Sequence, residues 1–269
     1  MSRIIMSQLS PSPLSGKHYN LITTPAAIGH QFDHTKLGVT AIPDVLDMAP
    51  HMAPVFDQGQ LSSCTGNTLV GALEYILNKK AGFVNTDAAF IGLSRLFVYY
   101  NERMIEGTIR EDSGALLSDG IRALSTYGAC KEEFFPYDVT KFSHTPSHAA
   151  YADGKTRIIT QFAQVSITED AFITTLAGGY PISIGIQIFA SFESDKVAHS
   201  GLVPMPTPNE ESLGGHAVLV SGYDRTKQLL KVRNSWGACW GDKGYFYLPF
   251  AYVFGSGLAS DTWVIEDIL

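Results

Sequence analysis

The amino-acid sequence predicts an α+β fold of two lobes, a helical lobe over about residues 60–150 and a β lobe over about residues 155–269. In the first half, apolar residues recur at helical spacing. The second half has short runs of β-branched and aromatic residues, separated by glycine and proline. A chain of 269 residues is long enough to bury a core of this size, either as one large domain or as two closely packed lobes.

The helix expected after Cys64 has the clearest signal. Its apolar positions recur at helical spacing and are Leu69, Val70, Leu73, Ile76 and Leu77. Ser62 or Ser63 can cap its first turn. Cys64 is therefore expected at or near a helix N-terminus, where the backbone dipole stabilises a thiolate.

The remaining elements follow the same two patterns. Two more helices are predicted, one over about residues 93–106 behind Ser94 and one over about residues 116–127. The segments with strand character are 157–167, 182–188, 217–223, 229–233 and 244–248. A short helix around residues 168–176 is expected to interrupt these strands.

The first 41 residues form a region of their own. Residues 7–16 are rich in serine and proline and are not expected to form a helix. Residues 21–40 show no convincing period. Two interpretations remain open for this region, a flexible leader or a short prosegment that docks on the cleft of the domain formed by residues 42–269.

Composition excludes several classes of partner. The chain has 45% apolar and 17% charged residues, which is ordinary for a soluble globular protein. Its formal net charge is −7 and its lysines and arginines are scattered, so no nucleic-acid partner is expected. No apolar run approaches the roughly 18 residues of a membrane span, so no membrane partner is expected either. The N-terminus lacks a signal-peptide core, but the compartment stays open.

The histidines and cysteines give no sign of a metal or cofactor. His144 and His148 are four residues apart, which suits a metal only on a helix, and Pro146 between them argues against a helix. The chain has three cysteines, so at least one is unpaired within it. Cys130 and Cys239 could pair, but free thiols are favoured because a core of this size needs no disulfide.

Four residues in order along the chain suit a cysteine nucleophile. Cys64 supplies a thiol, His216 an imidazole that takes and returns its proton, and Asn234 an amide that orients the ring. Gln58 precedes the thiol by six residues, where its amide could help to hold an oxyanion. Taken one at a time, a cysteine is more often an unreactive buried thiol, a histidine in an apolar run is more often packed in a strand, and an asparagine before Ser-Trp is more often a turn residue. With the thiol on the helical lobe and the imidazole on the β lobe, the reaction would occur in the groove between lobes.

Three segments that contain these residues resemble the papain-like (C1) cysteine peptidases. They are residues 54–64, 215–223 and 232–245, and weaker likenesses lie at 42–47, 112–115 and 127–137. The resemblance covers the chain from about Ile42 to its C-terminus. It implies the papain-like fold, with an antiparallel, barrel-like β lobe and the active site in the groove. It also implies a thiol protease acting on polypeptides, commonly secreted and made as a zymogen.

The resemblance also implies residue roles. Cys64, His216, Asn234 and Gln58 would be catalytic, and Trp236 would shield the hydrogen bond between His216 and Asn234. The residues that would border the substrate are Gly114, Ala115, Gly215, Ala217 and Trp236. The family favours a bulky apolar residue two positions before the cut.

The chain departs from the family at two positions beside the nucleophile. Leu61 stands where the family has a disulfide cysteine, and Thr65 stands where tryptophan usually follows the nucleophile. The second change removes an aromatic wall near the thiol. Neither change removes the nucleophile.

Alternatives to hydrolysis keep the same scaffold. The first is an acyltransferase or transamidase, in which an amine intercepts the thioester. The second is a catalytically silent binding protein, which fits poorly because all four catalytic positions are kept. The expected partners are a polypeptide substrate and the chain's own N-terminal segment, on a monomer without cofactor.

Overall fold

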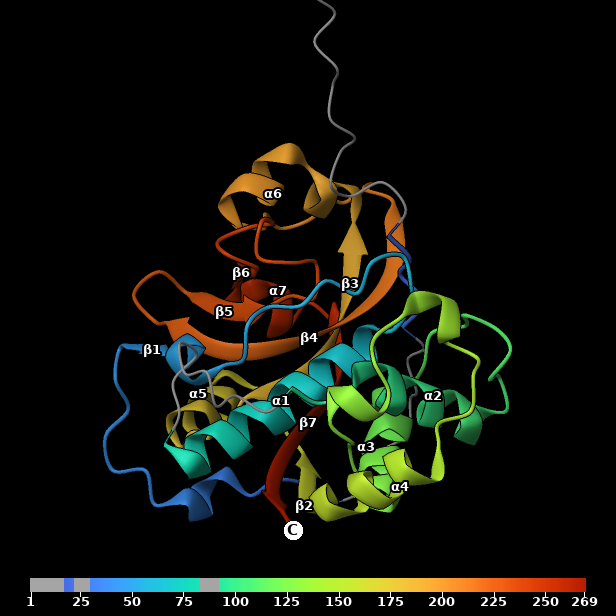
Figure 1. Cartoon of the computed structure of the whole chain (residues 1–269). Helices are drawn as coiled ribbons and strands as arrows, with labels where there is room; N and C mark the ends of the chain where they lie inside the picture. The colour runs from blue at the N-terminus through green and yellow to red at the C-terminus, as the bar shows by residue number, and fades with distance from the viewer. Residues whose placement is uncertain (1–16, 22–29, 83–91) are drawn as a thin grey trace, which may run out of the picture.

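The structure is a computed structural model that describes residues 17–21, 30–82 and 92–269 (Figure 1). Its α-helices are α1 (Cys64–Ala81), α2 (Arg95–Glu106), α3 (Leu117–Tyr127), α4 (His148–Gly154), α5 (Glu169–Ala177), α6 (Asp195–Ser200) and α7 (Phe250–Val253). Its strands are β1 (Val45–Asp47), β2 (Ile159–Gln164), β3 (Ile182–Phe189), β4 (Ser212–Asp224), β5 (Leu229–Arg233), β6 (Tyr245–Pro249) and β7 (Ala259–Ile268). The expected order of a helical part followed by a β part is confirmed.

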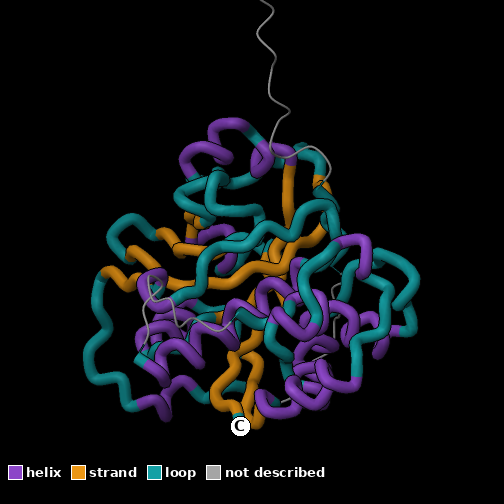
Figure 2. The backbone as a smooth tube through the Cα atoms, viewed as in Figure 1, coloured by secondary structure: helices purple, strands orange, loops and turns teal. Residues whose placement is uncertain are grey.

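The helical lobe is built from α1 to α4; α2, α3 and α4 gather on one side of the molecule, and α1 runs across its middle toward α5 (Figure 1), with helix and strand segments coloured in Figure 2. Most of α1 is buried, because it packs on α2 and α3 and also on β4 of the sheet. The cap of α2 is as expected, since Ser94 Oγ accepts a hydrogen bond from the Phe97 amide. The cap of α1 differs from the expectation. Ser63 is its N-cap residue, but the Ser63 side chain caps no backbone N–H, because its hydroxyl is hydrogen-bonded to the Tyr137 hydroxyl at 2.6 Å.

The β lobe is one antiparallel sheet. Its strands run in the order β2-β7-β3-β4-β5-β6, and β1 pairs with β4 outside this path. Within the described residues this path stays open, so the sheet curves without closing into a barrel. Strand β7 was not expected from the sequence, because serine, threonine and aspartate interrupt its apolar pattern.

Strand β4 connects the two lobes. It is the 13-residue strand that pairs with β1, β3 and β5, and it also packs against α1. Residues 214–220 of this strand are therefore held between the helical lobe and the rest of the sheet. This position brings His216 toward the first turn of α1.

Two parts of the N-terminal region pack on the domain. Residue Asn20 forms a parallel bridge with Gly215 of β4, and the Leu21 amide donates to the Gly215 carbonyl at 3.1 Å. Further along, the Phe32 amide donates to the Gln164 carbonyl at 2.7 Å, at the free edge of β2. The chain therefore contacts first the groove and then the sheet edge before it enters β1.

Candidate active site

The thiol of Cys64 lies at the first residue of α1 and has no exposed surface. Backbone N–H groups of Ala217, Thr65 and Cys64 itself lie near its sulfur and favour the thiolate form. Ala217 follows His216 on β4, so the thiol of the helical lobe faces the strand that carries the imidazole. The expected meeting of these two segments between the lobes is present.

The ring of His216 is held by the loop that follows β5. Its Nε2 and the Oδ1 of Asn234 are 2.9 Å apart. Trp236 stacks on the ring with centroids 5.1 Å apart and planes inclined by 23°. The other ring nitrogen, Nδ1, has no hydrogen-bond partner among the described residues. Asn234 therefore fixes one nitrogen of the ring and leaves the other free for a proton transfer.

Gln58 connects the loop before α1 to the loop that carries Asn234. Its Nε2 donates to the Leu61 carbonyl at 2.9 Å, and its Oε1 accepts from Ser235 Oγ at 2.5 Å. The backbone N–H of Gln58 also donates to the Ser235 backbone carbonyl at 2.8 Å. A primary amide has two N–H donors, so one N–H of the side chain remains for an acceptor in the groove.

The residues expected to border the substrate have different surroundings. Gly114 and Gly215 line the path of residues 19–21, and a Cβ atom on Gly114 would lie 1.9 Å from the Asn20 carbonyl oxygen. Gly215 carries the backbone pairing to Leu21 described above. Ala115, in contrast, is fully buried in an apolar cluster of the helical lobe.

Residues 17–21 cover the site. The Tyr19 ring meets His216 edge-on at a centroid distance of 6.2 Å, and its hydroxyl donates to Glu193. Asn20 Nδ2 donates to Ser62 Oγ at 3.1 Å, on the opposite side of the groove. Docking on the cleft was one of the two interpretations left open for the N-terminal region, and the composition of residues 17–21 does not decide between them, because main-chain pairing leaves no composition pattern.

Burial disfavours a charge on both Cys64 and His216 in this covered form. Desolvation raises the pKa of the Cys64 thiol to about 12 and lowers the pKa of His216 to about 4. Both shifts favour the neutral thiol and the neutral imidazole. The depressed thiol pKa expected from the helix N-terminus is thus absent here, because the loss of water outweighs the hydrogen bonds to the sulfur.

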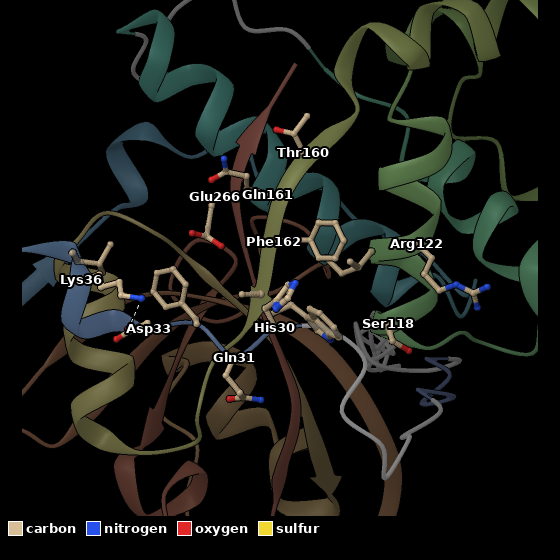
Figure 3. Close-up of a pocket in the computed structure, with 15 residues that line it drawn as sticks. His30, Gln31, Asp33, Lys36, Ser118, Arg122, Thr160, Gln161, Phe162 and Glu266 are labelled. Atoms are coloured by element: carbon tan, nitrogen blue, oxygen red, sulfur yellow. Dashed lines mark ion pairs between the residues drawn. The ribbon is translucent and has the colours of Figure 1, made fainter.

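A separate cavity of about 790 Å³ lies away from these residues (Figure 3). Its walls come from residues 30–37 of the N-terminal region, from Ser118 and Arg122 of α3 and from Phe162 of β2. The catalytic residues expected from the sequence do not line it. The groove at Cys64 is instead occupied by residues 17–21.

The three cysteines are free thiols, as favoured from the sequence, with Cys130 buried and Cys239 exposed. In the part of the chain that the structure describes, no cluster of histidine, cysteine, aspartate and glutamate could hold a metal ion. Within the same residues, no helix has both the length and the apolar character needed to cross a membrane.

Comparisons with known proteins agree with this geometry. A model of the papain family of cysteine proteases matches residues 42–253. An uncharacterised peptidase C1-like protein of Acanthamoeba polyphaga mimivirus is 38% identical over 227 residues, which are 81% of this chain and 71% of that protein. Procathepsin L of Felis catus is 27% identical over 72% of this chain and 56% of that protein.

A solved structure extends the likeness to the whole fold. Xylellain, a cysteine protease from Xylella fastidiosa, superposes with a TM-score of 0.84 at 34% identity. The match covers 94% of this chain and 97% of that one. The chain belongs to the papain family of cysteine proteases and is a hydrolase of that family.

Proposed function

We propose that the protein hydrolyses peptide bonds through a thioester on Cys64, with His216 as acid and base and Asn234 as its orienting partner. The observation that carries the proposal is the arrangement of the imidazole. Its Nε2 is bonded to Asn234, while Nδ1 has no partner among the described residues and lies on a strand whose next residue, Ala217, is close to the Cys64 sulfur. Cysteine nucleophiles need such a base, fixed by a third group.

The reaction follows from these positions. The thiol proton passes to Nδ1 of His216, and the sulfur attacks the substrate carbonyl carbon. The resulting oxyanion accepts hydrogen bonds from the Cys64 amide and the Gln58 side chain. The C–N bond then breaks as His216 protonates the leaving amine. Water, deprotonated by the imidazole, attacks the thioester and releases the carboxylic acid and the thiol.

We further propose that residues 17–21 act as an inhibitory prosegment. They cross the groove from Ser62 on one side to β4 on the other and cover His216. Lys17 Nζ, 2.8 Å from Asp57 Oδ1, fastens this segment to the loop that carries Gln58. Release of the segment would return water to the pair and allow the thiolate and imidazolium to form.

The same segment suggests the substrate preference. The Leu21 side chain is buried beside two glycines, since Cβ atoms on Gly185 and Gly215 would lie 2.7 and 3.0 Å from it. No charged side chain replaces these glycines in the pocket wall. A polypeptide with a bulky apolar residue at this position would fill the space that Leu21 fills.

The test is capture of the acyl-enzyme. The full chain is incubated with a peptide p-nitrophenyl ester, and the acylated residue is located by peptide mass spectrometry. We expect an adduct on Cys64, and Cys64→Ala should abolish both the adduct and turnover while the fold survives. Turnover retained by Cys64→Ala would overturn the assignment. Addition of an amine separates hydrolysis from transfer, since amide products would favour a transamidase.

A further inference from the structure

A buried glutamate lies behind the residue that follows Cys64. Glu102, within α2, has no exposed surface, and its Oε2 accepts a hydrogen bond from Thr65 Oγ1 at 2.6 Å. Thr65 is also fully buried and belongs to the first turn of α1. At the position where a tryptophan would follow the nucleophile, this chain thus has a hydroxyl bonded to a carboxyl group.

Three helices meet at this carboxyl group. Gly120 of α3 faces it, and a Cβ atom there would lie 2.5 Å from Glu102 Oε1 and 2.2 Å from Leu69 Cδ1. Glycine in a helix interior is destabilising relative to alanine, so its presence here has a packing reason. The absence of a side chain at this position leaves the space that the carboxyl group occupies.

Among the described residues no cation forms an ion pair with Glu102, and Arg103 only partly offsets the effect of burial on its pKa. The neighbouring Arg103 directs its Nη1 and Nη2 to three backbone carbonyls elsewhere. The other charged groups that face Glu102 are Glu106 on the same helix and Asp119 on α3, both acidic. Among the described residues, Glu102 Oε1 has no hydrogen-bond partner. A buried carboxyl group in such surroundings is favoured in its neutral form.

The electrostatics connect this group to the nucleophile. Burial raises the pKa of Glu102 to about 8, and the nearby acids Glu106 and Asp119 act in the same direction against Thr65 and Arg103. Once ionised, Glu102 raises the pKa of the Cys64 thiol. A protonated, neutral Glu102 therefore makes it easier for Cys64 to form a thiolate, and a thiolate at Cys64 favours the protonated form of Glu102.

We propose that Glu102 is a positioning residue for Cys64. As a neutral acid it holds Thr65 and the first turn of α1, and once ionised it opposes formation of the thiolate. This proposal rests on the assignment of Cys64 as the nucleophile. On this proposal, ionisation of Glu102 in the Thr65–Glu102 pair limits how far the reactivity of the Cys64 thiol increases at alkaline pH.

The test is the rate at which iodoacetamide alkylates Cys64 in the full chain, followed against pH by peptide mass spectrometry. Glu102→Gln keeps the shape of the side chain and stays neutral. We expect Cys64 in this variant to react about threefold faster, or more, than in the wild type at about pH 9, because a like charge has been removed. At about pH 6, where the wild-type carboxyl group is protonated, the two rates should coincide.

Two controls separate this effect from a loosened fold. Glu74→Gln changes a second fully buried glutamate, which lies on α1 and whose pKa is also raised to about 8 by burial. This variant should leave the pH profile of Cys64 alkylation unchanged. Buried Cys130 should remain slow in every variant. Coincident Cys64 profiles for Glu102→Gln and the wild type, or faster alkylation of Cys130 in Glu102→Gln, would overturn the proposal.

A second measurement uses the hydroxyl. Thr65→Val should lower kcat about tenfold, and Thr65→Ser, which restores the hydrogen bond, should recover it. Equal kcat for the two variants would count against the positioning role. Turnover retained by Cys64→Ala would instead overturn the proposed function, so the two failures are distinguishable.

Discussion

The imidazole of His216 depends on a few single side chains. Asn234 bonds one nitrogen, Trp236 stacks on one face, and Tyr19 packs against it edge-on. Because Asn234 and Trp236 come from the loop after β5 and Tyr19 comes from the N-terminal segment, removal of the segment would leave the orientation of the ring intact. What would change is its access to water and hence its capacity to hold a proton.

Gln58 should contribute to the rate through its free N–H. We expect Gln58→Ala to lower kcat/KM by about 10²–10³-fold, the usual cost of one oxyanion donor. Ser235→Ala is the matched control, because it removes only the partner of Gln58 Oε1 and leaves the amide donor in place. Steady-state kinetics on a peptide substrate measure both variants, and an equal loss in the two would refute the role of the donor.

At the scale of elements, the N-terminal region makes two separate contacts. Residues 17–21 lie in the groove, whereas residues 30–37 lie along the edge of β2 and against α5. In the second contact Phe32 is buried, and its ring packs on Tyr180 with centroids 5.9 Å apart. The two contacts serve different ends if the first blocks the site and the second completes the sheet.

The contact of Leu21 with the groove should control activity. Burial of a leucine stabilises a packed state by about 1.5–3 kcal/mol, so Leu21→Asp should release the segment and raise peptidase activity of the full chain about tenfold or more. Leu202→Asp serves as the control, since Leu202 is 50% exposed. Activity of Leu21→Asp equal to that of the wild type would exclude inhibition by this segment.

The second contact should stabilise the domain. A chain that begins at His30 keeps the pairing with Gln164 and the burial of Phe32, whereas a chain that begins at Ile42 loses both. We expect the shorter chain to have the lower Tm, by several degrees, because an apolar side chain and an edge of the sheet become exposed. Equal Tm values in scanning calorimetry would show that residues 30–37 add no stability.

At the scale of the whole molecule, buried carboxyl groups link stability to pH. Glu74 in α1 is fully buried, and Glu106 is half-buried in α2. Burial raises the pKa of Glu74 to about 8 and that of Glu106 to about 7. The folded state thus binds more protons than the unfolded state, where these groups titrate near about 4.3.

This linkage predicts a fall in stability as the pH rises. The contribution of these carboxyl groups is complete below about pH 4.3 and is lost as the pH passes through about 7–8, where they ionise in the folded state. In the inactive Cys64→Ala chain, Tm should therefore fall between about pH 5 and pH 8. Glu74→Gln should make this fall shallower, and identical slopes would contradict the prediction.

Helices α1, α2, α3 and α5 and most of the strands could be predicted because their signals are local, whereas the short helices α4, α6 and α7 were not expected. Ser94 caps α2 by accepting a hydrogen bond from the amide of Phe97, only three residues later. The apolar residues that recur at helical spacing after Cys64 cover several turns of α1. Strand β7 was not predicted because its stability comes from pairing with β2 and β3, which are distant in sequence. The absent side-chain cap of α1 has a similar cause, since the Ser63 hydroxyl is taken by Tyr137, 74 residues away.

The sequence by itself determined the family and the fold class, because the motifs around Cys64, His216 and Asn234 each need particular residue types at short spacing. Only the tertiary structure decided what lies over these residues. The N-terminal segment reaches the groove through backbone pairing with Gly215 and through the burial of Leu21. Main-chain hydrogen bonds and shape fit between distant segments depend on the folded arrangement, and no local pattern of residues specifies them.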